Sequence, residues 1–255
     1  MALLNGAKAA SYSVVFSVKS SVPAVPLTPG SITPPDPPGS ENPGPLLPAP
    51  LEWADVAATM TWYVKHPRRR FDATVQEGAE YVDPARVHPG MVPNRRGVLP
   101  SFYFLDGEAV ICAEVDAGSR CESVGRDWAQ WAMPVIGQSP LLYFAFLAEA
   151  DETQLGRIWR GQWESGSRGA REMQGAAAHC FGTEAFGPPI EWCYSSMGVP
   201  LRIEVSPDPS TGWRGLTMEA LSHRIGIPES ELDPPSAPQP SSLALPGPGA
   251  PTPPP

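Results

Sequence analysis

Residues 101–115 read SFYFLDGEAVICAEV, and this stretch decides the predicted fold class. Apolar and aromatic residues lie on both sides of Asp106-Gly107, a dipeptide typical of the two-residue turns that join antiparallel strands. The stretch therefore predicts a β-hairpin. The same strand character, in part a clear alternation of apolar and polar residues, occurs over 10–21, 56–65, 67–76, 171–181, 190–195, 200–205 and 215–222.

Two stretches interrupt the strand pattern. Residues 3–10 favour a short helix, and residues 126–162 favour a helical insertion. In the insertion, Asp127 is a candidate N-cap, Trp128 and Trp131 fall at helical spacing, and a strongly apolar run follows. Together these elements predict an α+β fold, in which about nine to eleven antiparallel strands form a sheet with helices on one face.

Proline marks two segments that we expect to be disordered. The chain has 255 residues and 34 prolines, of which 11 lie in residues 23–50 and 10 in residues 234–255. Segments so poor in apolar side chains cannot offset their ordering entropy by burial. We therefore expect one domain over 1–233, interrupted by the proline-rich insertion 23–50, and a disordered tail over 234–255.

The four cysteines favour two local disulfides. Cys112 and Cys121 bracket one turn-rich stretch, and Cys180 and Cys193 bracket another. A hairpin would place each pair on neighbouring strands within bonding distance, although four cysteines allow three connectivities. The alternatives are a zinc site near His179, for which the CxxC spacing is absent, and four unpaired buried thiols. Disulfides would indicate an oxidising, extracytoplasmic compartment.

Charge and motifs narrow the class of function. The net charge of −9 argues against a nucleic-acid partner, because binding to its phosphates would need a basic face. No HExxH, no nucleophile elbow and no triad-like context surrounds the histidines or serines, so we expect no enzymatic activity, no metal and no cofactor. No apolar run reaches the about 18 residues of a membrane span. The run Arg68-Arg-Arg70 is read as a solvated turn, or as a site for a lipid phosphate or an acidic partner.

Several short motifs, taken in order, resemble the LolA/LprG/LppX-type lipoprotein and lipid carriers. The opening helix and first strand are matched by LLNGAKAASYSVVFSV at 3–18, and the second strand pair by PRRRFD at 67–72 within 60–72. The closing strand is matched by GVPLRIEV at 198–205, and the last strand and turn by LTMEA at 216–220 with DPP at 233–235. The resemblance implies a half-open β-barrel, a curled sheet whose concave face is covered by helices.

The resemblance also implies a cavity between the curved sheet and the 126–162 helices, which would act as a lid. We expect that cavity to hold a lipid or an acyl chain of a lipoprotein, because apolar walls stabilise such ligands by burial. Plain core packing is the alternative reading of the same residues. The cavity candidates are Trp128, Trp131, Met133, Leu141, Tyr143, Phe144 and Phe146.

The predicted function is therefore that of a non-enzymatic, exported binding protein, a monomer with at most peripheral membrane contact. The alternative is a cell-envelope sensor or protein-interaction module with the same fold and a filled core. We expect any export leader to have been removed or to lie upstream of Met1, and the chain shows no lipobox cysteine for a lipid anchor.

Overall fold

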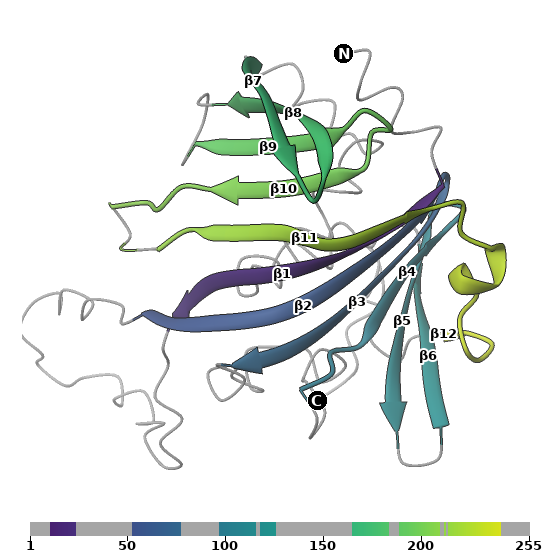
Figure 1. The fold of residues 1–255 in the computed structure, drawn as a ribbon. Helices are drawn as coiled ribbons and strands as arrows, with labels where there is room; N and C mark the ends of the chain where they lie inside the picture. The colour runs from purple at the N-terminus through teal and green to yellow at the C-terminus, as the bar shows by residue number, and fades with distance from the viewer. Residues whose placement is uncertain are drawn as a thin grey trace, which may run out of the picture.

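The computed structural model describes residues 11–23, 53–77, 97–115, 118–125, 165–183, 189–209, 212 and 214–240. These residues form one curled sheet (Figure 1). Its strands are β1 (Tyr12–Pro23), β2 (Trp53–Lys65), β3 (Arg68–Glu77), β4 (Ser101–Leu105), β5 (Glu108–Val115), β6 (Gly118–Gly125), β7 (Ser165–Met173), β8 (Ala176–Thr183), β9 (Ile190–Ser195), β10 (Pro200–Val205), β11 (Leu216–Ile225) and β12 (Gln239–Pro240).

The α+β prediction is wrong for the part of the chain described. Its elements are the twelve strands and one short 3-10 helix, η3 (Glu229–Leu232), so no helix of these residues covers a face of the sheet. The two helical predictions, 3–10 and 126–162, lie outside the described residues. Period-two alternation is clear in β2, where buried and less buried side chains alternate along almost the whole strand.

The strand order is β12-β6-β5-β4-β3-β2-β1-β11-β10-β9-β8-β7. It consists of two sequential meanders, β1 to β6 and β7 to β11, which meet where β1 pairs with β11. All pairings are antiparallel except that of the two-residue β12, which runs parallel to β6. In Figure 1 the first meander curves away below β1, and the second lies above β11.

Two sequence predictions differ in detail from these strands. A turn at Gln174-Gly175, with positive φ at both residues, divides the strand predicted over 171–181 into β7 and β8. The tail predicted to be disordered from residue 234 contains β12 and a hydrogen bond from the Ser236 hydroxyl to the Ser119 carbonyl. Pro23, at the start of the proline-rich insertion, pairs with Trp53 in the β1–β2 ladder.

Both local cysteine pairs are bonded. Cys112 and Cys121 face each other across β5 and β6, and Cys180 and Cys193 face each other across β8 and β9. In each pair the residues are directly opposed in an antiparallel ladder, and their Cα atoms are 4.0 Å apart. Hairpin pairing thus selects one of the three connectivities.

Candidate functional site

The cavity residues predicted in the 126–162 insertion, from Trp128 to Phe146, all lie outside the described residues. The candidate site must therefore be built from the sheet itself. Directly opposed residues of neighbouring strands share one face, so the register shows which side chains lie together. One face of the sheet carries almost all of its main hydrophobic core.

A continuous apolar row crosses six strands on this face, which we call the apolar face. It passes from β2 through β1, β11, β10 and β9 to β8, and each member is opposed to the next in the ladder. The row consists of Ala58, Val18, Met218, Ile203, Trp192 and Phe181. The first four are almost completely buried. The row thus connects apolar side chains of the two meanders.

Aromatic rings connect the strands of the first meander on the same face. The Phe16 ring lies 5.0 Å from Trp62, Trp62 lies 5.5 Å from Phe71, and Phe71 lies 5.7 Å from Phe104, measured between ring centroids. All three contacts are edge-to-face, the arrangement that aromatic quadrupoles favour. The Trp62 indole N–H has a partner, the Met60 sulfur at 2.8 Å. These contacts form a four-strand aromatic ladder that stiffens this half of the face.

Two polar groups interrupt the apolar face. Arg69 is buried on β3 between Phe104 and Val64, and its charge lowers the pKa of Tyr12, although burial outweighs this and raises that pKa well above its ordinary value. At the other end, Trp192 stacks on Tyr194, with centroids 6.4 Å apart and planes 6° from parallel. The buried Trp192 Nε1–H has no acceptor among the described residues.

The opposite face holds an arginine between two tyrosines. The Arg70 guanidinium lies 5.0 Å from the centre of the Tyr63 ring and 5.3 Å from that of Tyr103. Its nitrogens also contact both oxygens of Asp72, at 2.8 and 3.0 Å. Burial raises the pKa of each tyrosine, and the guanidinium opposes that rise. Arg70 is thus fully engaged within the fold.

A C-terminal strap, residues 226–240, crosses from β11 to β6. Glu229 pairs with Lys65 at 2.8 Å, Asp233 pairs with Arg68 at 2.8 Å, and Leu232 is completely buried. Arg68 and Arg70 also donate to strap carbonyls, at 3.0 and 3.2 Å respectively. The prediction of a solvated turn at Arg68-Arg-Arg70 is therefore wrong: the outer two arginines hold the strap, and the middle one is buried on the apolar face.

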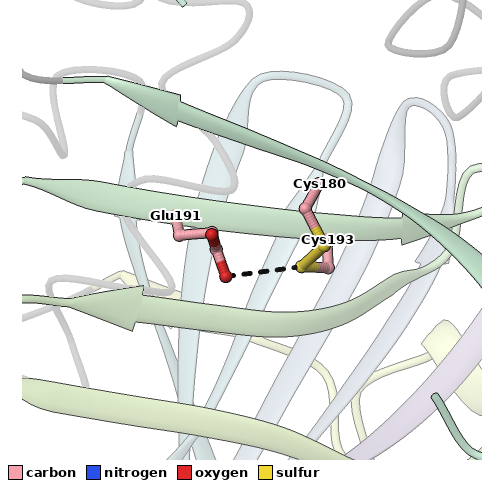
Figure 2. Close-up of side chains that lie close together, drawn as sticks. All are labelled: Cys180, Glu191 and Cys193. Atoms are coloured by element: carbon pink, nitrogen blue, oxygen red, sulfur yellow. Dashed lines mark hydrogen bonds between the residues drawn. A yellow bond between two sulfur atoms is a disulfide. The ribbon is translucent and has the colours of Figure 1, made fainter. Parts of the chain in front are cut away.

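Cys180, Glu191 and Cys193 bring two sulfurs and a carboxylate within metal-ligand distance of one another (Figure 2). Oε1 of Glu191 lies 3.9 Å from Sγ of Cys193, but this sulfur is in the disulfide and has no proton to donate. Glu191 is also paired with Arg171 at 2.8 Å and lies 4.0 Å from Arg202. Two neighbouring cations and the absence of thiolates disfavour a bound metal ion.

Sequence reasoning missed the polar groups of the apolar face. Trp192 and Arg69 both lie in segments that the sequence predicts to be strands. Carrying the alternation through β3 would have placed Arg69 with Phe71, on the buried face. No sequence pattern indicates that the Trp192 Nε1–H lacks an acceptor among the described residues, because this depends on which groups other strands place near the ring.

Comparison with known proteins gives only distant structural likenesses. No protein-family model matches the sequence, and no curated protein matches it. The MucA/MucB complex of Pseudomonas aeruginosa is similar at a TM-score of 0.40 and 10% identity, over 91% of this chain and 58% of that one. An uncharacterised conserved protein from Thermus thermophilus scores 0.41 at 8% identity, over 93% of both chains.

An outer membrane lipoprotein-sorting protein domain from Vibrio parahaemolyticus scores 0.29 at 7% identity, over 88% of this chain and 89% of that one. This chain spans less than two thirds of the MucB chain. The neighbours thus include a lipoprotein-sorting domain, as the motif resemblance would lead one to expect, but scores this low carry no argument about function. Within the described residues, no helix has the length and hydropathy needed to cross a membrane.

Proposed function

We propose that this chain is an extracytoplasmic binding protein that holds an acyl chain of a lipid or acylated lipoprotein against the apolar face of its sheet. The observation that carries the proposal is the continuous apolar row from Ala58 to Phe181, opposed residue by opposed residue across six strands. The described residues form a single sheet, and the row from Ala58 to Ile203 is almost completely buried. On this proposal a bound acyl chain takes the place of part of what buries these side chains.

The energetics of such a site favour an apolar ligand. Each Å² of apolar surface removed from water contributes about 25 cal/mol, so even part of an alkyl chain laid along this row gains several kcal/mol. The edge-to-face ladder from Phe16 to Phe104 fixes one side of the face before any ligand arrives. A preformed wall of this kind loses little conformational entropy on binding.

The polar groups of the face match the polar end of such a ligand. The Trp192 Nε1–H is a buried donor without an acceptor among the described residues, and an ester, amide or carboxylate oxygen would satisfy it. Arg69 places a buried positive charge on the same face, toward the other end of the sheet. An amphipathic lipid with one acceptor group therefore fits this face better than a plain hydrocarbon does.

The proposal also includes an extracytoplasmic location and a role without catalysis. Two disulfides persist in oxidising compartments and are rare in the cytosol, which supports an extracytoplasmic location. Exchange of a lipid needs no covalent step, so we propose a carrier or holder and not an enzyme. The second candidate, a protein-interaction module with a filled core, is favoured by the nearly zero exposure of residues such as Ile203 and Met218.

The test is to purify the chain from a bacterial host and to measure bound lipid by native mass spectrometry and, on a separate sample, by extraction with organic solvent. Ala220→Phe places a ring beside Phe16 on the apolar face, and Ser17→Phe places one on the opposite face as a matched control. Ala220→Phe should lose co-purifying lipid and uptake of a fluorescent fatty acid, whereas Ser17→Phe should retain both. Thermal melts show which variants are folded.

Trp192→Phe gives a second, milder variant. It keeps the aromatic ring and removes the N–H that lacks an acceptor in the described structure, so stability should be unchanged or slightly higher. Binding of the fatty acid should weaken about tenfold, as expected for one lost hydrogen bond to a charged group. A wild-type protein that carries no lipid and takes up no fatty acid would contradict the proposal and favour the filled-core interaction module.

A further inference from the structure

The edge of β11 is open over its second half. β11 pairs with β1 along its whole length, but β10 pairs with it only at residues 216–219. Residues 221–225 therefore have a neighbouring strand on one side alone among the described residues, and all five are exposed. In Figure 1, β11 runs on past the start of β10 toward η3. We call this region, residues 221–225 with the β9–β10 turn, the notch.

One hydrogen bond shows in which direction the backbone N–H and C=O groups of the open edge point. The Gly226 N–H donates to the Ser11 carbonyl at 2.6 Å, so that N–H points toward β1. In an antiparallel strand, successive residues direct their N–H and C=O groups to opposite sides. His223 and Ile225 therefore direct theirs away from β1, into the notch. A row of donors and acceptors in this spacing is complementary to one more strand.

Exposed apolar side chains gather at the same place. Three large apolar side chains of the described part are exposed: Met197 at 57%, Leu221 at 54% and Ile225 at 45%. Leu221 and Ile225 belong to the open edge. Met197 lies in the β9–β10 turn, which directly precedes β10 and so borders the notch at the point where the β10–β11 pairing ends. Open backbone and exposed apolar surface thus coincide.

We propose that the notch binds an extended segment of a partner protein, which adds to β11 as an extra strand. Ile225 is opposed to Tyr12, so an apolar side chain of the added strand beside Ile225 would continue the apolar face. The exposed Glu219 lies at one end of the edge, and His223 and Arg224 lie toward the other. The matching segment carries apolar residues beside Leu221 and Ile225 and a carboxylate opposite His223, because Arg224 is already paired with Glu231.

The dimensions favour a peptide segment over a second copy of this chain. Five residues of edge are about 17 Å long, enough to pair with one short strand. A stable dimer needs about 800 Å² from each partner, far more than one such edge supplies. Strand addition gains its affinity from main-chain hydrogen bonds and its specificity from alternate side chains, so a short edge is sufficient. The inference is independent of the proposed lipid site.

The experiment uses the full chain as bait for a displayed library of short peptides with Val, Ile or Leu at alternate positions. His223→Pro removes one notch-facing N–H and leaves the β1 ladder bonded, and Leu221→Glu with Ile225→Glu removes the apolar contacts. A Glu172→Ala variant, exposed on β7, is the control. Circular dichroism and thermal melts verify that each variant is folded.

The wild type and the control should enrich a common set of peptides, and both edge variants should bind them about tenfold or more weakly. N-methylation of a selected peptide on its pairing edge should abolish binding, and hydrogen exchange at His223 and Ile225 should slow when the peptide is present. Peptides that bind both edge variants as well as the wild type would overturn the proposal. The proposal would also be overturned if the wild type enriched no peptides beyond those that the edge variants enrich. It would likewise be overturned if hydrogen exchange at the edge slowed only through self-association of the protein.

Discussion

The Trp62 ring lies edge-on to Phe71 on the neighbouring strand, with ring planes 84° apart and centroids separated by 5.5 Å. The two residues are directly opposed in the β2–β3 ladder and are almost completely buried. They form the middle step of the aromatic ladder from Phe16 to Phe104. Because this ladder joins four strands, its loss should be felt across the whole first meander.

Phe71→Ala should therefore lower the free energy of unfolding by about 3–5 kcal/mol, the range for truncating a buried aromatic. Phe71→Leu, which keeps most of the volume, should cost less. A double-mutant cycle with Trp62→Ala, measured by urea unfolding, should give a coupling of about 0.5–1.5 kcal/mol for the ring contact. Additive effects of the two substitutions would show that the rings do not interact.

The two disulfides should each stabilise the fold. Replacing Cys180 and Cys193 together by alanine should lower the free energy of unfolding by about 2–4 kcal/mol, and replacing Cys112 and Cys121 should do so by a similar amount. An intact-mass measurement without reductant should show four hydrogens fewer than the reduced chain, since each bond removes two. A mass equal to that of the reduced chain would contradict both pairings.

Burial, and not surface charge, should account for most of the strap's contribution to stability. Leu232→Ala removes a completely buried side chain and should cost about 2–5 kcal/mol. Lys65→Ala breaks an exposed ion pair with Glu229 and should cost far less, and least of all at high salt. Chemical denaturation at low and high salt distinguishes the two. Equal losses in both variants would contradict this division.

Alkaline pH should destabilise the fold through its buried tyrosines. Burial raises the pKa of Tyr12, Tyr63 and Tyr103 in the folded state, so their contribution is complete below the unfolded-state pKa of about 10. It is lost as pH rises from there through the folded-state values. Absorbance titration should show fewer tyrosines ionising near pH 10 than in the urea-unfolded chain, and Tyr12→Phe should lose less stability at high pH than the wild type.

Local features of this fold could be predicted from sequence, and features that depend on distant segments could not. The Asp106-Gly107 turn and the cysteine pairs follow from residues close together in the chain, and both are present. The ion pairs of the strap with Lys65 and Arg68 join residues more than 160 positions apart, and no periodicity indicates them. The proline-rich composition predicts disorder from residue 234, but it does not prevent β12 from pairing with β6.

Part of the candidate site could likewise be predicted from the sequence, and part could not. The alternation of β2 and β11 indicates which side chains are buried, and so an apolar face could be expected. Trp131 and Phe144, which the sequence predicts to line a cavity, lie outside the described part of the chain. The notch depends on where β10 begins relative to β11, which is a matter of register between strands and not of either strand's sequence.

The meeting of β1 with β11 has a consequence for the order in which the protein is made. β1 leaves the ribosome long before β11, its partner on one side, since Tyr12 pairs with Ile225. The first meander can form while synthesis continues, but one edge of β1 must wait until β11 has been made. Until then, that edge exposes backbone groups and apolar side chains such as Val14 and Phe16, which makes the nascent chain a natural client for chaperones.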